Sequence, residues 1–75
     1  MKEKVLAILT NLIPTIDFAH ETKLVDDKLI DSLMIINIIS ELSIAFDIDI
    51  NFDQITSDNL NSAEAMVAMI ERLKP

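Results

Sequence analysis

The feature that most constrains this chain is the segment of residues 32–46, whose apolar side chains follow helical spacing. The first apolar row recurs at intervals of four, three and four residues: Ile35, Ile39, Leu42 and Phe46. A second row lies beside it: Met34, Ile38 and Ala45. A helix that is apolar around most of its circumference has to be covered by other elements. We therefore predict a helix over residues 32–46 at the centre of the fold.

Two further amphipathic helices can supply that cover. The first is predicted over residues 2–13 and stops at Pro14, and its stripe is Val5, Ile8, Leu9, Leu12 and Ile13. The last follows a candidate capping box from Asn61 to Glu64, and its stripe is Ala63, Met66, Val67, Ile70 and Leu73. One or two helical turns are expected over residues 53–57. The prediction is an all-α bundle with three main helices and one short helix, forming a single domain over residues 1–75.

The connections are also expected to pack against the core. Residues 14–31 lack sustained periodicity but contain several apolar side chains that can pack on the core: Ile16, Phe18, Leu24, Val25, Leu29 and Ile30. Residues 47–51 read as a short extended connection, and the apolar residues there and just beyond are expected on the core: Ile48, Ile50 and Phe52. The sequence has no glycine, so Asp47 is predicted to take the left-handed conformation that ends the preceding helix.

Composition excludes several classes of function. The net charge is −7, which argues against binding to nucleic acid or to anionic membranes, because both are held by Lys and Arg. The absence of Cys rules out disulfides and thiol nucleophiles within the chain. No apolar run is long enough to span a membrane, and the first residues do not read as a signal peptide. We expect a soluble, cytoplasmic monomer.

The junction at Asp31-Ser32-Leu33 is the strongest candidate for a functional site. Asp31 is a good N-cap residue, which places Ser32 in the first turn of the central helix. Backbone N–H groups are unpaired there and the helix dipole is positive, so an anion carried on the Ser32 oxygen would be stabilised. The simpler alternative is that both residues only cap the helix.

The chain resembles the acyl and peptidyl carrier protein family over essentially its whole length. The family's attachment motif, Asp-Ser-Leu/Met, matches Asp31-Ser32-Leu33. Further segments resemble the loop that leads into this motif, the end of the second helix and the start of the last helix: residues 24–30, 41–50 and 58–66. The family commonly has glycine shortly before the Asp-Ser pair and after the second helix. In this chain, residues 28–30 and Asp47 occupy those places.

The resemblance implies a carrier protein without catalytic residues of its own. Ser32 would receive 4′-phosphopantetheine from coenzyme A through a phosphopantetheinyl transferase, with Asp31 and Leu33 flanking the attachment. The arm's thiol would hold an acyl or aminoacyl group as a thioester for the enzymes that load, elongate or transfer it. Fatty acyl, D-alanyl or other aminoacyl, and polyketide cargo all remain open. The alternative of another class is a non-enzymatic helical adaptor without a prosthetic group.

Charge on the central helix departs from the acidic helix usual in fatty-acid carriers. Glu41 is the only charged residue between Leu33 and Phe46. We predict that partners dock on four residues with more apolar than ionic character: Leu33, Met34, Asn37 and Glu41. Charge reversal at Glu41 is then expected to weaken docking less than Met34→Asp. Ile44 and Met34 are predicted to be partly exposed, although scattered surface hydrophobes are also normal.

Two other functions, hydrolysis and calcium binding, are compared with the carrier function. A hydrolase would need a base for Ser32, and the only histidine, His20, lies in the first loop, where a surface position is expected. Residues 47–58 imitate a calcium loop, but Phe52 stands where such a loop needs glycine and Asp58 where it needs glutamate. No resident metal is predicted.

Overall fold

The computed structural model describes residues 1–74, and the regular secondary structure in this part of the chain is entirely helical. The elements are α1 (Lys2–Leu12), α2 (Ser32–Phe46), the 3-10 turn η1 (Phe52–Gln54), α3 (Ser57–Leu60) and α4 (Ala63–Leu73). The predicted all-α bundle, with a short helix before the last one, is confirmed. α2 has the predicted bounds, and α1 ends one residue before the predicted boundary, with Ile13 as its C-cap.

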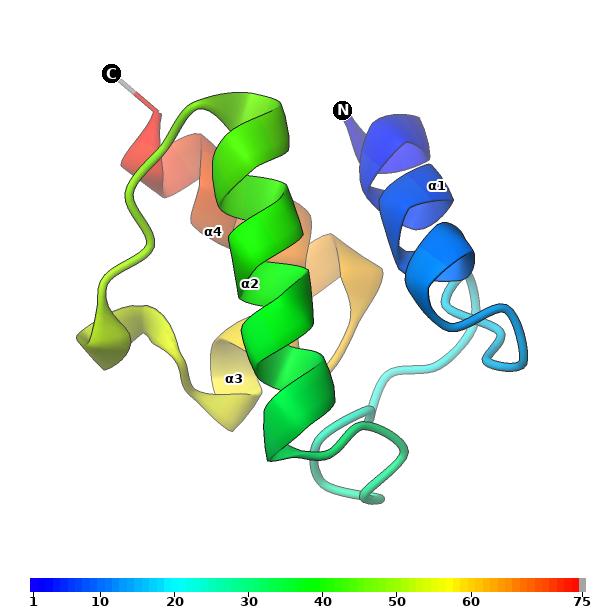
Figure 1. The fold of residues 1–75 in the computed structure, drawn as a ribbon. Coiled ribbons are helices and arrows are strands. Elements are labelled where there is room, and N and C mark those ends of the chain that lie inside the picture. Colours follow the sequence, from blue (N-terminus) through cyan, green and yellow to red (C-terminus); the bar gives the residue numbers. More distant parts are fainter. Residues whose placement is uncertain (75) are drawn as a thin grey trace.

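The helices enclose one hydrophobic core. α1 packs against both α2 and α4, and α3 packs against α4 (Figure 1). The four α-helices, the loop between α1 and α2 and the connection after α2 all contribute buried side chains: Val5, Leu9, Phe18, Leu24, Ile30, Ile38, Leu42, Ile48, Leu60, Ala63, Met66, Met69 and Ile70. In α2 the buried residues, Ile38 and Leu42, come one from each predicted apolar row. The side of α2 that carries Leu33, Ile36 and Ile44 stays exposed.

The long loop between α1 and α2 packs on the core through three widely spaced side chains. Phe18, Leu24 and Ile30 are buried, as predicted. Leu29 is 39% exposed, so its predicted place on the core is wrong. Its neighbour Ile30 takes the buried position at this point.

The connection after α2 follows the predicted alternation only as far as it stays extended. Ile48 is buried and Ile50 packs against the core. Phe52, by contrast, is 88% exposed, which contradicts its predicted burial. The extended segment ends at Asn51 and the chain then curls into η1, so the period-two pattern no longer applies to Phe52.

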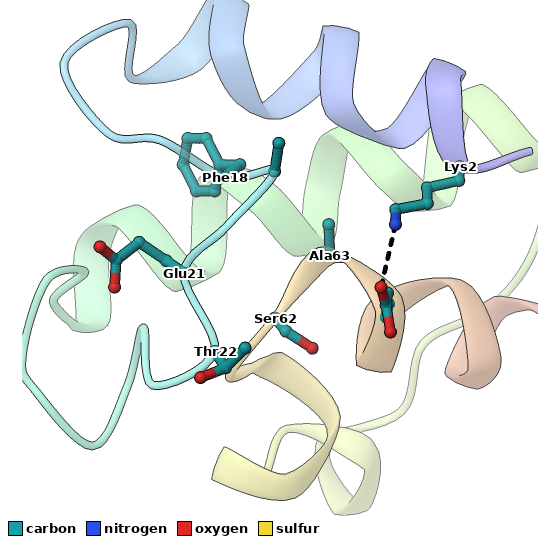
Figure 2. A pocket seen from close by; sticks show the side chains of 8 residues that line it. Lys2, Phe18, Glu21, Thr22, Ser62 and Ala63 are labelled. Carbon is teal, nitrogen blue, oxygen red and sulfur yellow. Dashed lines mark hydrogen bonds and ion pairs between the residues drawn. The ribbon is translucent and has the colours of Figure 1, made fainter.

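The N-terminus of α4 is capped by a different residue from the predicted one. The Ser62 hydroxyl accepts a hydrogen bond from the Ala65 N–H at 3.0 Å, so Ser62 is the N-cap. The predicted capping box from Asn61 to Glu64 is therefore wrong, since Asn61 lies one residue too early. Glu64 instead pairs with Lys2 of α1 at 3.0 Å (Figure 2).

Two lysines cover the C-terminal end of α2. Lys4 Nζ donates to the Ala45 carbonyl at 3.3 Å and lies 5.1 Å from the Phe46 ring centroid. Lys74 Nζ lies 5.9 Å from the same centroid. Positive charge is favourable both at a helix C-terminus and over an aromatic face. These contacts tie α1 and the end of α4 to α2.

The chain lacks glycine but has two residues with left-handed backbone conformations, Lys28 (φ 58°) and Asp47 (φ 52°). Asp47 is the C-cap of α2, as predicted, and the N–H groups of Asp47 and Ile48 both donate to Ser43. Lys28 lies in the loop before Ser32.

Lys28→Gly is expected to raise the free energy of unfolding by about 0.5–1 kcal/mol, because the left-handed conformation costs a residue with a Cβ more than it costs glycine. Lys23→Gly is the matched control, since Lys23 is an exposed loop lysine without positive φ. It should lower stability by about 0.5 kcal/mol through the added freedom of the unfolded chain. Urea unfolding measures both changes. A loss of stability in both variants would contradict the prediction.

Candidate functional site

The start of α2 is built around the Asp31 side chain. Asp31 has an extended backbone (φ −98°, ψ −179°), and its Oδ1 accepts a hydrogen bond from the Met34 N–H at 2.9 Å. The Asp31 carbonyl accepts from the Ile35 N–H at 2.9 Å. The predicted N-cap is confirmed, and it fixes Ser32 as the first residue of α2.

Ser32 presents a free hydroxyl at this helix end. The residue is exposed, and within residues 1–74 its hydroxyl makes no hydrogen bond. In the same part of the chain, the N–H groups of Ser32 and Leu33 donate to no protein acceptor. A hydroxyl beside unpaired N–H donors, at the positive end of the helix dipole, suits the attachment of an anionic group such as a phosphodiester.

A groove of about 350 Å³ opens beside this first turn of α2. It lies between the end of α1 and the start of α2, and it is lined by Leu12, Ile13, Pro14, Asp31, Leu33, Met34 and Asn37. Three of the four predicted docking residues therefore share one groove. Glu41 is exposed but does not line it. Leu12, Ile13 and Pro14, at and just after the end of α1, were missed as groove residues, because their place beside α2 depends on tertiary packing.

The outer face of α2 is apolar. Leu33 is 68%, Ile36 60% and Ile44 75% exposed, which confirms the predicted exposure of Ile44. Ile44 lies eleven positions after Leu33, close to three helical turns, so both lie on the same side of α2. Ile36 was missed as an exposed residue, although its helical spacing from Leu33 could have revealed it. Met34 is half-buried and packs against the core.

The arrangement of side chains gives little support to a hydrolase or to a metal site. The Nδ1 atom of the exposed His20 lies 2.8 Å from Asp17 Oδ2, and within residues 1–74 no hydrogen bond joins His20 to Ser32. In the described part of the chain, no three Asp, Glu or His side chains are grouped so that they could hold a metal ion. The hollow between the first loop and the start of α4, lined in part by Phe18 and Ser62 (Figure 2), measures about 30 Å³. That is room for about one or two water molecules.

Comparison of the chain with protein-family models, with curated proteins and with solved structures found no match. None of the helices within residues 1–74 has the length and apolar character needed to cross a bilayer.

Proposed function

We propose that this chain is a carrier protein that bears a 4′-phosphopantetheine arm on Ser32. One observation carries the proposal: Ser32 is an exposed, unbonded hydroxyl at the first position of a helix whose N-terminus is capped by the preceding residue, Asp31. The choice of 4′-phosphopantetheine as the attached group rests on the whole-chain resemblance of the sequence to acyl and peptidyl carrier proteins. The all-α bundle with a long first loop is the fold that this resemblance leads one to expect.

The proposed loading step uses an activation that comes from outside the chain. The Ser32 Oγ attacks the pantetheine-side phosphorus of the coenzyme A pyrophosphate, forming a phosphodiester. The bond to the other phosphate breaks and adenosine 3′,5′-bisphosphate leaves. A base of the transferase takes the hydroxyl proton, and its magnesium ion stabilises the developing charge.

The arm would supply the only thiol of the loaded protein, because the chain has no Cys. An acyl or aminoacyl group would be held on this thiol as a thioester and presented to enzymes that load, elongate or transfer it. The near-neutral α2 favours a specialised or D-alanyl type of carrier over a fatty-acid carrier, although the overall charge of −7 suits both.

The test is incubation of the purified protein with coenzyme A, magnesium and a promiscuous phosphopantetheinyl transferase, followed by intact-mass measurement. A gain equal to one phosphopantetheine is the expected result. No gain with several different transferases would overturn the proposal. It would favour the adaptor, for which the exposed apolar face of α2 would be the binding surface.

We also propose that partner enzymes dock on α2 at Leu33, Met34, Asn37 and Glu41, mainly through apolar contacts with Leu33 and Met34. Because Met34 is half-buried, Ile36 is a better probe of the exposed face than Met34. Ile36→Asp is expected to raise the KM of the transferase for this protein about tenfold. Glu41→Lys should raise it about twofold, since an exposed rim charge contributes little. Equal effects, or a larger effect of Glu41→Lys, would refute apolar docking.

A further inference from the structure

Asn61, between α3 and α4, binds the distant loop that leads to Ser32. Its backbone carbonyl accepts a hydrogen bond from the Leu24 N–H at 2.9 Å. Its side-chain Oδ1 accepts from the N–H groups of Val25 at 2.9 Å and Asp26 at 3.1 Å. Its Nδ2 donates to the Asp26 carboxylate at 3.1 Å. One residue therefore makes four hydrogen bonds to a segment 35 or more positions earlier in the chain.

The segment held by Asn61 in turn holds the residue before the N-cap of α2. The Leu24 carbonyl accepts hydrogen bonds from the N–H groups of Leu29 at 2.9 Å and Ile30 at 3.2 Å. Lys28, which lies between Leu24 and Leu29, has a left-handed backbone that closes the turn. Its N–H donates to the Val25 carbonyl at 3.0 Å. The side chains of Leu24 and Ile30 are both buried. Because Ile30 is bonded directly to Asp31, the contacts run without a gap from Asn61 to the cap that sets Ser32.

We propose that Asn61 is a positioning residue for Ser32. Its side-chain amide holds residues 24–26 in the one arrangement that lets Leu24 fix Leu29 and Ile30, and so sets where Ser32 is presented. The functional part of this inference rests on the proposed modification of Ser32. The structural part, that Asn61 orders the loop as far as Ile30, depends only on the hydrogen bonds described above.

The first test compares Asn61→Ala with Asn59→Ala. Asn59 is a matched control, because its side chain donates to Gln54 at 2.8 Å and accepts from Arg72 at 2.8 Å but makes no contact with the first loop among the hydrogen bonds of residues 1–74. In Asn61→Ala, amide hydrogen exchange at Leu29 and Ile30 is expected to speed up about tenfold relative to Leu42 in α2. The kcat/KM for modification of Ser32, assayed well below the unfolding temperature, is expected to fall about tenfold. Asn59→Ala should change neither ratio.

The second test exchanges the two partners. Asn61→Asp keeps an acceptor for the Val25 and Asp26 amides but loses the donor to Asp26 and sets two carboxylates side by side. It should impair modification of Ser32. Adding Asp26→Asn restores a donor opposite the new carboxylate, so the double variant should recover most of the lost kcat/KM. The amide exchange rate at Leu42 in the same variants shows whether overall stability has changed instead.

The outcomes separate this inference from the proposed function. If the wild-type protein gains no phosphopantetheine, the proposed function fails, and the exchange rates at Leu29 and Ile30 decide whether Asn61 orders the loop. If Ser32 is modified but Asn61→Ala and Asn59→Ala are equally good substrates, or the double variant shows no rescue, the positioning role is overturned while the carrier function stands.

Discussion

Ser32→Ala is expected to gain no phosphopantetheine at all under conditions in which the wild-type protein is fully converted. The reason is chemical, because alanine leaves no oxygen to form the phosphodiester. The fold should be unaffected, since the Ser32 hydroxyl is exposed and unbonded. Surface replacements of this kind change the free energy of unfolding by about 0.5 kcal/mol or less. Intact mass and urea unfolding, measured on the same preparation, check both parts.

Ser40→Ala is the matched control, because Ser40 is also exposed on α2 but lies two turns from its start. It should be modified as fully as the wild type. The remaining α2 serine, Ser43, is a poorer control, since its hydroxyl donates to the Ile39 carbonyl at 2.8 Å. A mass gain that persists in Ser32→Ala, or disappears in Ser40→Ala, would move the attachment site away from the predicted position.

The parts of the fold that could be predicted are those set by local signals. The spacing of apolar residues and the Asp31 cap gave α2 its bounds, and the place of Asp47 after Phe46 gave the left-handed C-cap. Each of these depends on contacts within about one helical turn. The candidate site shares this property, because Asp31, Ser32 and Leu33 are consecutive.

The parts that could not be predicted depend on contacts between distant segments. Asn61 fits the pattern of an N-cap, yet its side chain bonds to Val25 and Asp26, and Ser62 caps α4 instead. Local spacing assigns a face to a residue but cannot say whether another element covers that face. The contribution of α1 to the groove beside Ser32 is of this kind. The exposure of Phe52 has a local cause instead, the turn η1 that follows Asn51.

Leu42→Ala is expected to lower the free energy of unfolding by about 3 kcal/mol. Leu42 is fully buried on the core side of α2, so truncation removes its packing and leaves a cavity. A domain of this size is stabilised by only about 4–11 kcal/mol in total. The variant should therefore lose a large share of its stability, seen as a lower midpoint of urea unfolding with an unchanged m-value.

Ile44→Ala provides the matched control on the same helix, because Ile44 is 75% exposed and should change stability by about 0.5 kcal/mol or less. The two variants also separate folding from docking. Leu42→Ala, assayed below its unfolding midpoint, should keep a normal KM for the transferase, because no exposed group is altered. Ile44→Ala should stay stable but raise that KM if partners use the apolar face of α2. Equal losses of stability in the two variants would contradict the division of α2 into a core side and an exposed side.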